Sequence, residues 1–415
     1  MSQVVSAPAS TDSRGNAVGG GTSRDASRPF GSIPGLVICV ALGFALYGLF
    51  SLIGGASPAF DYAAIIDGIT SSLPKQLAWF LMDWTEPTFY ASAFAGAGLI
   101  LGGVVAWVLA LRKSRLAGFT VCYGEHTIFP WVLASQLISL ALSIFVFRYI
   151  DGFNTPGVTA VATFVPIVAA PPAAMLIYGP SIPALLVSSV LGGLMCSPVA
   201  TWLATCVTGP LGLPGVVANV TSMALCGFAI FMVLKVLPWV KKVPVRDQRP
   251  TLTPVEDVHT TSWFVRRVIA EFSEAPFYGS ESASILMFIG LLVGTLVCAG
   301  HNVNGASAAL PAILLSQFVA AAVGVFLYAN KFAEGGWYAT YVPVVSVGPA
   351  CVLALGASIP VALVAGVLGG ILGGPVAEFV ASRLPDDVHP TVGNVASMAI
   401  CTAFVYIVMV ALPWF

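Results

Sequence analysis

The chain contains the stretch TFVPIVAAPPAAMLIYGPSIPALLVSSVLGGLMCSPVA, residues 163–200, and repeats it as TYVPVVSVGPACVLALGASIPVALVAGVLGGILGGPVA, residues 340–377. The two stretches align without a gap. Pro198 matches Pro375, and the glycines that precede Pro198 match glycines that precede Pro375. Apolar segments resemble one another by composition, but composition does not reproduce the order of prolines and glycines. The pattern therefore predicts an internal repeat.

The repeat extends on both sides of this stretch and includes polar residues. The further matches are Phe89-Tyr90 with Phe277-Tyr278, Ser135-Gln136 with Ser316-Gln317, Asn219 with Asn394, Ser222-Met223-Ala224 with Ser397-Met398-Ala399, and Leu237-Pro238-Trp239 with Leu412-Pro413-Trp414. The two copies are predicted to occupy residues 88–239 and 276–415.

The amino-acid composition indicates that these copies fold in a lipid bilayer rather than in water. Of the 415 residues, 58% are hydrophobic and 8% are charged, whereas a soluble domain carries about 25% charged residues. This excludes a soluble protein, a disordered chain and an autonomous nucleic-acid binder. Eleven apolar runs are long enough to cross a bilayer as helices. They lie near residues 33–55, 88–111, 127–147, 157–178, 182–207, 214–236, 281–300, 309–329, 337–357, 360–382 and 392–413.

The positions of the 17 basic residues predict the orientation of these spans. With the N-terminus in the cytoplasm, every Lys and Arg except Lys75 and Arg148 falls on the cytoplasmic side, as the positive-inside rule requires. The C-terminus is then external, and we expect a multi-pass protein of the cytoplasmic membrane. Each copy holds five spans, an odd number, so the copies have opposite orientations. The expected fold is an all-α polytopic membrane protein with about eleven transmembrane helices, one N-terminal helix plus two five-helix inverted-topology repeats with broken helices.

The remaining segments are assigned by composition. They are a disordered cytoplasmic tail (1–30), an N-terminal transmembrane helix (31–56), an external interfacial segment (57–87) and a cytoplasmic linker (240–275). Two alternatives stay open. The first span is either an uncleaved anchor or is cleaved near Ala56. The third and fourth spans of each copy are either full crossings or a re-entrant hairpin.

Helix-breaking residues mark the candidate binding site. Prolines interrupt the third span of each copy, and the fourth span is expected to break between the paired glycines and Pro198 or Pro375. Broken helices at matching places in two halves are typical of a transporter binding site, although the glycines are equally suited to close helix packing. The candidate substrate-binding residues are Gly192, Gly193, Ser197, Asn219, Ser222, Gly369, Gly373, Asn394 and Ser397.

Glu378 is the candidate for ion coupling. An acid within an apolar span is costly and is a functional candidate for that reason. Its alternative role is interfacial, since Arg383 follows five residues later.

Together these patterns predict a secondary active transporter that moves a small solute or ion by alternating access, coupled to protons or sodium. The alternatives are a channel-like facilitator of a neutral solute and a non-transporting membrane enzyme or assembly factor. Metal-protease, serine-hydrolase and phosphate-loop motifs are absent from the sequence. We therefore expect no enzyme activity and no cofactor. The expected partners are the lipid bilayer and the transported solute, without nucleic acid, and a homo-oligomer is compatible with the apolar surface.

Overall fold

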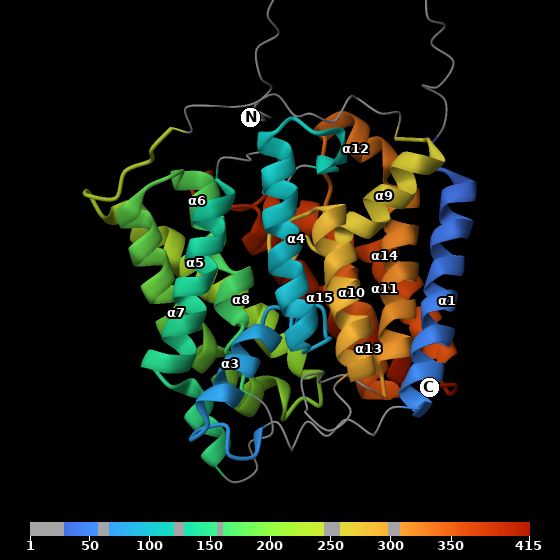
Figure 1. Cartoon of the computed structure of the whole chain (residues 1–415), viewed down its shortest axis with the longest axis horizontal. Coiled ribbons are helices and arrows are strands. Elements are labelled where there is room, and N and C mark those ends of the chain that lie inside the picture. The colour runs from blue at the N-terminus through green and yellow to red at the C-terminus, as the bar shows by residue number, and fades with distance from the viewer. Residues whose placement is uncertain (1–28, 57–65, 120–127, 156–160, 245–257, 298–307) are drawn as a thin grey trace, which may run out of the picture.

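The computed structural model shows a bundle of helices (Figure 1). The structure describes residues 29–56, 66–119, 128–155, 161–244, 258–297 and 308–415. Most of the expected tail and the middle of the expected linker lie outside the described residues.

Among the described residues, eight helices are long and apolar enough to cross a membrane. They are α1 (Ile33–Ala56), α4 (Ala93–Leu111), α5 (Phe129–Ala141), α7 (Ile182–Leu203), α8 (Gly215–Val236), α11 (Leu310–Leu327), α14 (Ile359–Ala381) and α15 (Thr391–Val410). Further turns extend α5 to Asn154 and α7 to Thr208. The other three expected spans contain the shorter helices α6 (Ala170–Tyr178), α10 (Glu281–Val297) and α13 (Val347–Leu355). The chain is thus a helical membrane protein.

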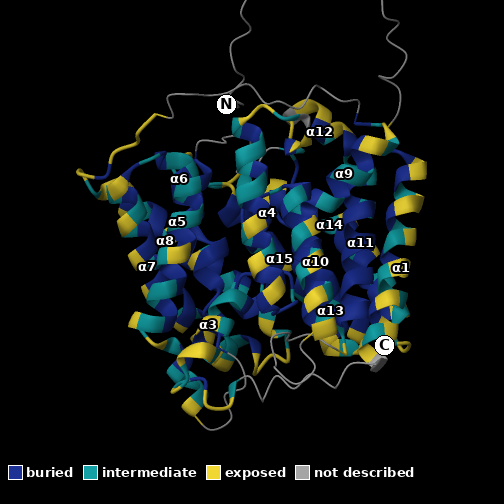
Figure 2. Cartoon of the chain, viewed as in Figure 1, coloured by how far each residue is buried: buried dark blue, intermediate teal, exposed yellow. Residues whose placement is uncertain are grey.

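The outer surface of the bundle suits a lipid environment. Exposed residues on α1 and α7 alternate with buried ones along each helix (Figure 2). Many of these exposed side chains are large and apolar, such as Leu52, which is 78% exposed, and Trp202, which is 57% exposed. Apolar surface of this extent is stable against lipid chains and costly in water.

The helices form two groups joined at the centre. In Figure 1, α5, α6, α7 and α8 lie to the left, and α11, α13, α14 and α1 lie to the right. Helix α4 packs on α10 between the groups, and α8 packs on α15. The start of α1 and the end of α11 share one face, since the amide of Gly31 donates to the carbonyl of Phe326 at 2.8 Å. We call this side of the bundle the first face, and the opposite side the second face.

Helices α4 and α10 run antiparallel with their backbones in close contact. A Cβ on Gly98 would lie 2.2 Å from the carbonyl oxygen of Leu286, and one on Gly290 would lie 2.2 Å from that of Phe94. Glycine is needed here because any side chain would overlap the facing backbone. Both helices follow a short helix, α3 (Leu73–Met82) before α4 and α9 (Thr261–Glu271) before α10. Helix α12 (Ala329–Gly335) follows α11.

The third segment of each copy is irregular, as the prolines predict. Residues Val165–Val168 form a 3-10 turn, and α6 begins only after Ala169 departs from helical geometry at φ −110° and ψ −143°. Residues Val342–Val345 form the matching 3-10 turn, and Ser346 separates it from α13 at φ −148° and ψ −76°. The missing amide of proline permits such interruptions because the ladder of helical hydrogen bonds is already incomplete.

The expected break in the fourth span is wrong. Helices α7 and α14 are uninterrupted and contain their prolines within the helix. The glycines allow close packing instead: a Cβ on Gly192 would lie 2.4 Å from Cγ of Pro171, and one on Gly373 would lie 2.5 Å from Cδ of Pro343. The irregular third segment therefore lies directly on the glycine face of the regular fourth helix.

Candidate functional site

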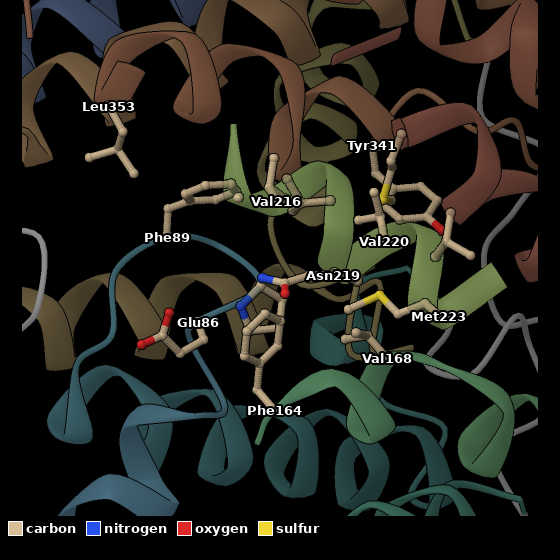
Figure 3. A pocket seen from close by; sticks show the side chains of 16 residues that line it. Glu86, Phe89, Phe164, Val168, Val216, Asn219, Val220, Met223, Tyr341 and Leu353 are labelled. Atoms are coloured by element: carbon tan, nitrogen blue, oxygen red, sulfur yellow. The ribbon is translucent and has the colours of Figure 1, made fainter. Parts of the chain in front are cut away.

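A cavity of about 260 Å³ lies where the two groups of helices meet (Figure 3). Its lining is mostly apolar, and Glu86 and Asn219 supply polar side chains. The other lining residues are Pro87, Phe89, Phe164, Val168, Gly215, Val216, Val220, Met223, Ala275, Tyr341, Val345, Leu353, Val395 and Met398. An apolar cavity with a few convergent polar groups is the usual form of a small-molecule site.

Many lining residues occupy matching positions in the repeat. Phe164 and Tyr341, Val168 and Val345, Val220 and Val395, and Met223 and Met398 are such pairs. The two third segments and the pair α8 and α15 thus contribute side chains from matching sequence positions to one cavity.

The two copies nevertheless contribute unequally to the cavity. Glu86, Phe89 and Asn219 line it and are partly exposed. Their counterparts Glu274, Phe277 and Asn394 do not line it and are only 3%, 2% and 2% exposed. The exposed lining residues Gly215 and Leu353 stand at the start of α8 and near the end of α13. The cavity is therefore open where the first copy supplies Asn219 and closed where the second supplies Asn394.

Two short acidic loops border the cavity. We call residues 83–92 (DWTEPTFYAS) the first acidic loop and residues 271–280 (EFSEAPFYGS) the second acidic loop. Their backbones match: Phe89 has φ 67° and Phe277 has φ 69°, a left-handed conformation that is rare for phenylalanine. Strained backbone of this kind persists where surrounding contacts enforce it, and it gathers at functional sites.

Hydrogen bonds within each loop repeat as well. The hydroxyl of Thr85 accepts from the amide of Ser92 at 2.9 Å and donates to its carbonyl at 3.1 Å. In the second acidic loop, Ser273 accepts from the amide of Ser280 and donates to its carbonyl, each at 2.9 Å. These bonds close both loops into the same shape and direct their acids inward.

The first residue of each acidic loop binds a threonine of the third segment. Thr163 donates to Oδ2 of Asp83 at 2.6 Å, and Thr340 donates to Oε1 of Glu271 at 2.5 Å. Asp83 and Glu271 are completely buried. Asp83, near the end of the stretch expected to be an external interfacial segment (57–87), therefore lies inside the protein, where the third segment packs on it.

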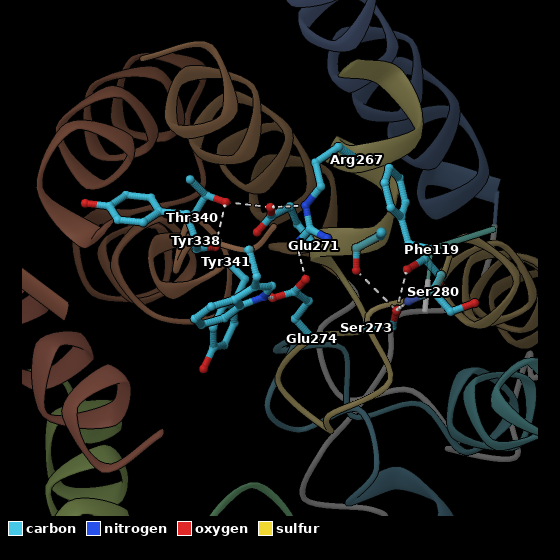
Figure 4. Close-up of polar contacts among 12 residues, drawn as sticks. Phe119, Arg267, Glu271, Ser273, Glu274, Ser280, Tyr338, Thr340 and Tyr341 are labelled. Atoms are coloured by element: carbon cyan, nitrogen blue, oxygen red, sulfur yellow. Dashed lines mark hydrogen bonds and ion pairs between the residues drawn. The ribbon is translucent and has the colours of Figure 1, made fainter. Parts of the chain in front are cut away.

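The two acids differ in their other partners. Arg267 on α9 pairs with Glu271 at 3.0 Å and also with Glu274 (Figure 4). Trp79 occupies the matching position on α3, and its Nε1 donates to Thr163 at 2.8 Å. The acids of the second acidic loop thus pair with a cation on the preceding helix α9, and α3 has an indole at the matching position.

Each acidic loop is anchored by a glutamine of the other copy. The side-chain amide of Gln136 donates to the carbonyl of Pro276 at 2.9 Å, and Gln317 donates to the carbonyl of Thr88 at 3.0 Å. Tyr278 and Tyr90 donate to the oxygens of these glutamines, at 3.3 and 2.7 Å. Each glutamine also donates to its own third segment, at Ile167 and Val344, both at 2.9 Å. The two copies are interlocked by these reciprocal bonds.

Replacing Gln136 with leucine is expected to destabilise the protein by about 1–2 kcal/mol, because buried carbonyls of Pro276 and Ile167 lose their donor. Tyr278→Phe removes only the longer hydroxyl bond and should cost less. Thermal unfolding of the purified protein in detergent measures both. An unfolding temperature for Gln136→Leu equal to that of the parent would contradict the anchoring role.

The structure places the sequence-predicted site residues in different surroundings. Asn219 projects into the cavity (Figure 3). Ser222 and Ser397 donate to helix carbonyls, Cys196 at 2.7 Å and Gly373 at 3.0 Å. Asn394 donates to the hydroxyl of Tyr341 at 3.2 Å.

The other predicted residues lie on α7 and α14, behind the third segments. Ser197 is buried, and its hydroxyl has no hydrogen-bond partner among the described residues. Gly192 faces Pro171, and Gly369 and Gly373 face Pro343, so these three glycines lie against the third segments. Gly193 instead faces the backbone of Ser139 on α5.

Glu378 lies away from the cavity. It pairs with Lys331 at 2.8 Å and accepts from the hydroxyl of Tyr338 at 2.8 Å. Its side chain is 51% exposed. The structure thus places it at the surface near α12.

The acids of the two loops were missed at the sequence level, although the repeat itself carries the signal. Extending the match of Phe89-Tyr90 with Phe277-Tyr278 by six residues pairs Asp83 with Glu271 and Glu86 with Glu274. Acids at the same two positions of both copies would have marked these loops.

No known protein family, curated protein or solved structure matches the chain.

Proposed function

We propose that the protein is a secondary carrier that moves a small, largely apolar solute with a polar group across the cytoplasmic membrane by alternating access. The observation that carries the proposal is the unequal exposure of matching residues around one cavity. Asn219 is reachable from one end, while Asn394 is sealed at the other. A carrier in one of its two states has equivalent halves in different conformations, and the unequal exposure agrees with this.

The opposite state follows from exchanging the conformations of the two copies. The second copy would then open at Glu274 and Asn394, and the first would close over Glu86 and Asn219. The proposal includes eleven crossings, an inverted repeat and a cytoplasmic N-terminus. In that orientation the first face is cytoplasmic, and the state described here opens to the exterior.

The irregular third segments are the proposed moving parts. Each contributes to the cavity through Phe164 or Tyr341 and rests on a glycine surface of α7 or α14 that offers few interlocking side chains. Transport rather than catalysis is proposed, because Glu86 and Asn219 line the cavity without a neighbouring nucleophile or histidine among its lining residues.

A matched pair of cysteine substitutions tests the proposal. Asn219→Cys and Asn394→Cys are each made in a version lacking the eight native cysteines, and membrane-impermeant thiol reagents are added to either side of oriented vesicles. We expect Asn219→Cys to react from one side and Asn394→Cys from the other. Conditions that speed one reaction should slow the other, since the two positions open in different states.

The remaining outcomes each contradict the proposal. Simultaneous reaction of both cysteines under all conditions would indicate a channel-like facilitator. An Asn394→Cys that never reacts, although the protein is folded and Asn219→Cys does, would indicate a static cavity. Val233→Cys, on the exposed lipid side of α8, controls for reagent that enters the bilayer.

A further inference from the structure

Asp83 is a buried acid, and no ion pair joins it to another residue that the structure describes. Its side chain is 0% exposed, and its oxygen Oδ1 has no hydrogen-bond partner among the described residues. Its other oxygen accepts from Thr163. Ionised carboxylates are costly in such surroundings unless paired, so the neutral acid is favoured.

The neighbours of Asp83 reinforce this preference. The third segment contributes the hydroxyl of Thr163, α3 contributes the indole of Trp79, and the loop contributes the carboxyl of Glu86, whose negative charge further disfavours an ionised Asp83. Arg267, which lies beside the matching acid of the second copy, already pairs with Glu271 and Glu274.

The two copies differ at this position. Glu271 occupies the position of Asp83 in the repeat and meets the same kind of hydroxyl, yet Arg267 pairs with it and with Glu274. The chain thus places a guanidinium beside one of the two matching acids, and among the described residues it places none beside the other. A proton would neutralise Asp83 without any further ligand, because it bonds directly to the unpartnered Oδ1.

We infer that Asp83 is the proton-binding residue that couples transport to a proton gradient, an inference that rests on the carrier function proposed above. Movement of the third segment, which covers Asp83, admits water from the open side, and a hydronium ion transfers one proton to Oδ1, where an O–H bond forms and neutralises the carboxylate. In the opposite state the cavity opens at the end of the second copy, and the O–H bond breaks as the proton passes through the cavity to water on that side. No other reactant is required.

The site is linked to the cavity through adjacent residues. Thr163 binds Asp83, and Phe164, the next residue, lines the cavity. Glu86 lies three residues beyond Asp83 and also lines it. Displacement of the third segment by a solute at Phe164 would therefore move the hydroxyl that holds Asp83.

The first test detects the proton directly. Infrared spectra of the purified protein at neutral pH should contain a protonated-carboxyl band that Asp83→Asn removes. Asparagine is nearly isosteric with the neutral acid, so the variant should remain folded, as measured by its unfolding temperature. Asp387→Asn, at an exposed ion pair with Lys235, is the matched control and should keep the band. A band unchanged in a folded Asp83→Asn would overturn the inference.

The second test measures coupling. In the Asn219→Cys background, the rate of reaction with the impermeant thiol reagent is divided at each pH by the rate for a small free thiol, which removes the ionisation of the thiol itself. This ratio should depend on pH by up to about tenfold per pH unit for one linked proton, and Asp83→Asn should make the ratio independent of pH. A pH dependence that survives Asp83→Asn but disappears in Glu378→Gln would assign the proton to Glu378, and a dependence on sodium instead of pH would assign a different ion. Both results would overturn the inference.

The two proposals can fail separately. If Asn394→Cys never becomes reactive, the carrier function fails, whereas the infrared band still reports on Asp83. If cysteine reactivity alternates but the band is unaffected by Asp83→Asn, the carrier function stands and the proton site fails.

Discussion

Replacing Arg267 with methionine is expected to destabilise the protein by about 3–5 kcal/mol, the usual cost of removing one partner from a buried ion pair. Its side chain is 6% exposed, and it is the cation shared by Glu271 and Glu274, which are 0% and 3% exposed. Methionine preserves much of the packing against Phe119 and Phe332, whose rings lie 5.5 and 5.1 Å from the guanidinium. The loss therefore reports mainly on the two uncompensated carboxyl groups. Thermal or denaturant unfolding in detergent measures it.

Two further variants separate charge from packing. Combining Arg267→Met with Glu271→Gln and Glu274→Gln removes the buried charges together and should recover most of the lost stability, because a buried ion pair is often replaceable as a whole. Lys331→Met breaks the exposed pair with Glu378 and should cost about 0–1 kcal/mol. Equal losses from Lys331→Met and Arg267→Met would show that burial does not govern the Arg267 cluster.

The asymmetry between the acidic loops fits the proposed coupling. Arg267 fixes one positive charge beside the second acidic loop, and Trp79 supplies none beside the first. Burial raises the pKa of Glu271 to about 8 although Arg267 lowers it, since one guanidinium is shared by two carboxyl groups. The asymmetry between the loops therefore lies in the fixed counter-charge, which Asp83 lacks among the described residues.

The sequence was sufficient to predict the helical membrane class, because scarcity of charge and long apolar runs depend on composition alone. It also identified the polar residues at equivalent positions: Gln136 and Gln317 make matching contacts between the copies, and Asn219 lines the cavity. Such residues are detectable because a polar side chain repeated in an apolar segment is costly unless it has a partner.

The break expected in the fourth span was wrong because glycine and proline have two structural roles in membrane proteins. In water these residues usually end a helix, but inside a membrane bundle they are tolerated where neighbouring segments pack closely or satisfy the freed carbonyl. Gly192 and Gly373 accommodate Pro171 and Pro343 of the third segment, a contact between residues about 20 to 30 positions apart. Sequence periodicity does not contain that contact.

The burial of the first acidic loop could not be predicted, for a different reason. Residues such as Asp83 and Glu86 alternate with aromatic ones, and this pattern equally describes a helix lying at the membrane surface. What buries Asp83 is the third segment, which follows about 80 residues later and brings Thr163 to it. Burial of a charged residue by a distant segment is a tertiary effect that local pattern cannot predict.

Substituting Gly98 by alanine is expected to have the second large effect, a destabilisation at the upper end of the about 1–3 kcal/mol typical of overpacking. The added Cβ would lie 2.2 Å from the carbonyl oxygen and 2.8 Å from the carbonyl carbon of Leu286, which are backbone atoms of α10. A flexible side chain could move aside, but a helix backbone can yield only if α4 and α10 separate.

Separation of these helices would also act on the cavity. Helices α4 and α10 begin immediately after the two acidic loops, so forcing them apart displaces the loops that hold Glu86 and Glu274. We therefore expect Gly98→Ala to change the reactivities of Asn219→Cys and Asn394→Cys as well as the unfolding temperature. Gly48→Ala is the matched control: it lies in α1, where a Cβ would meet no described atom within 4 Å, and alanine there should be neutral or stabilising by about 0.5–1 kcal/mol. If both variants unfold at the temperature of the parent, the α4–α10 backbone contact is not close, and the two helices do not move as one unit.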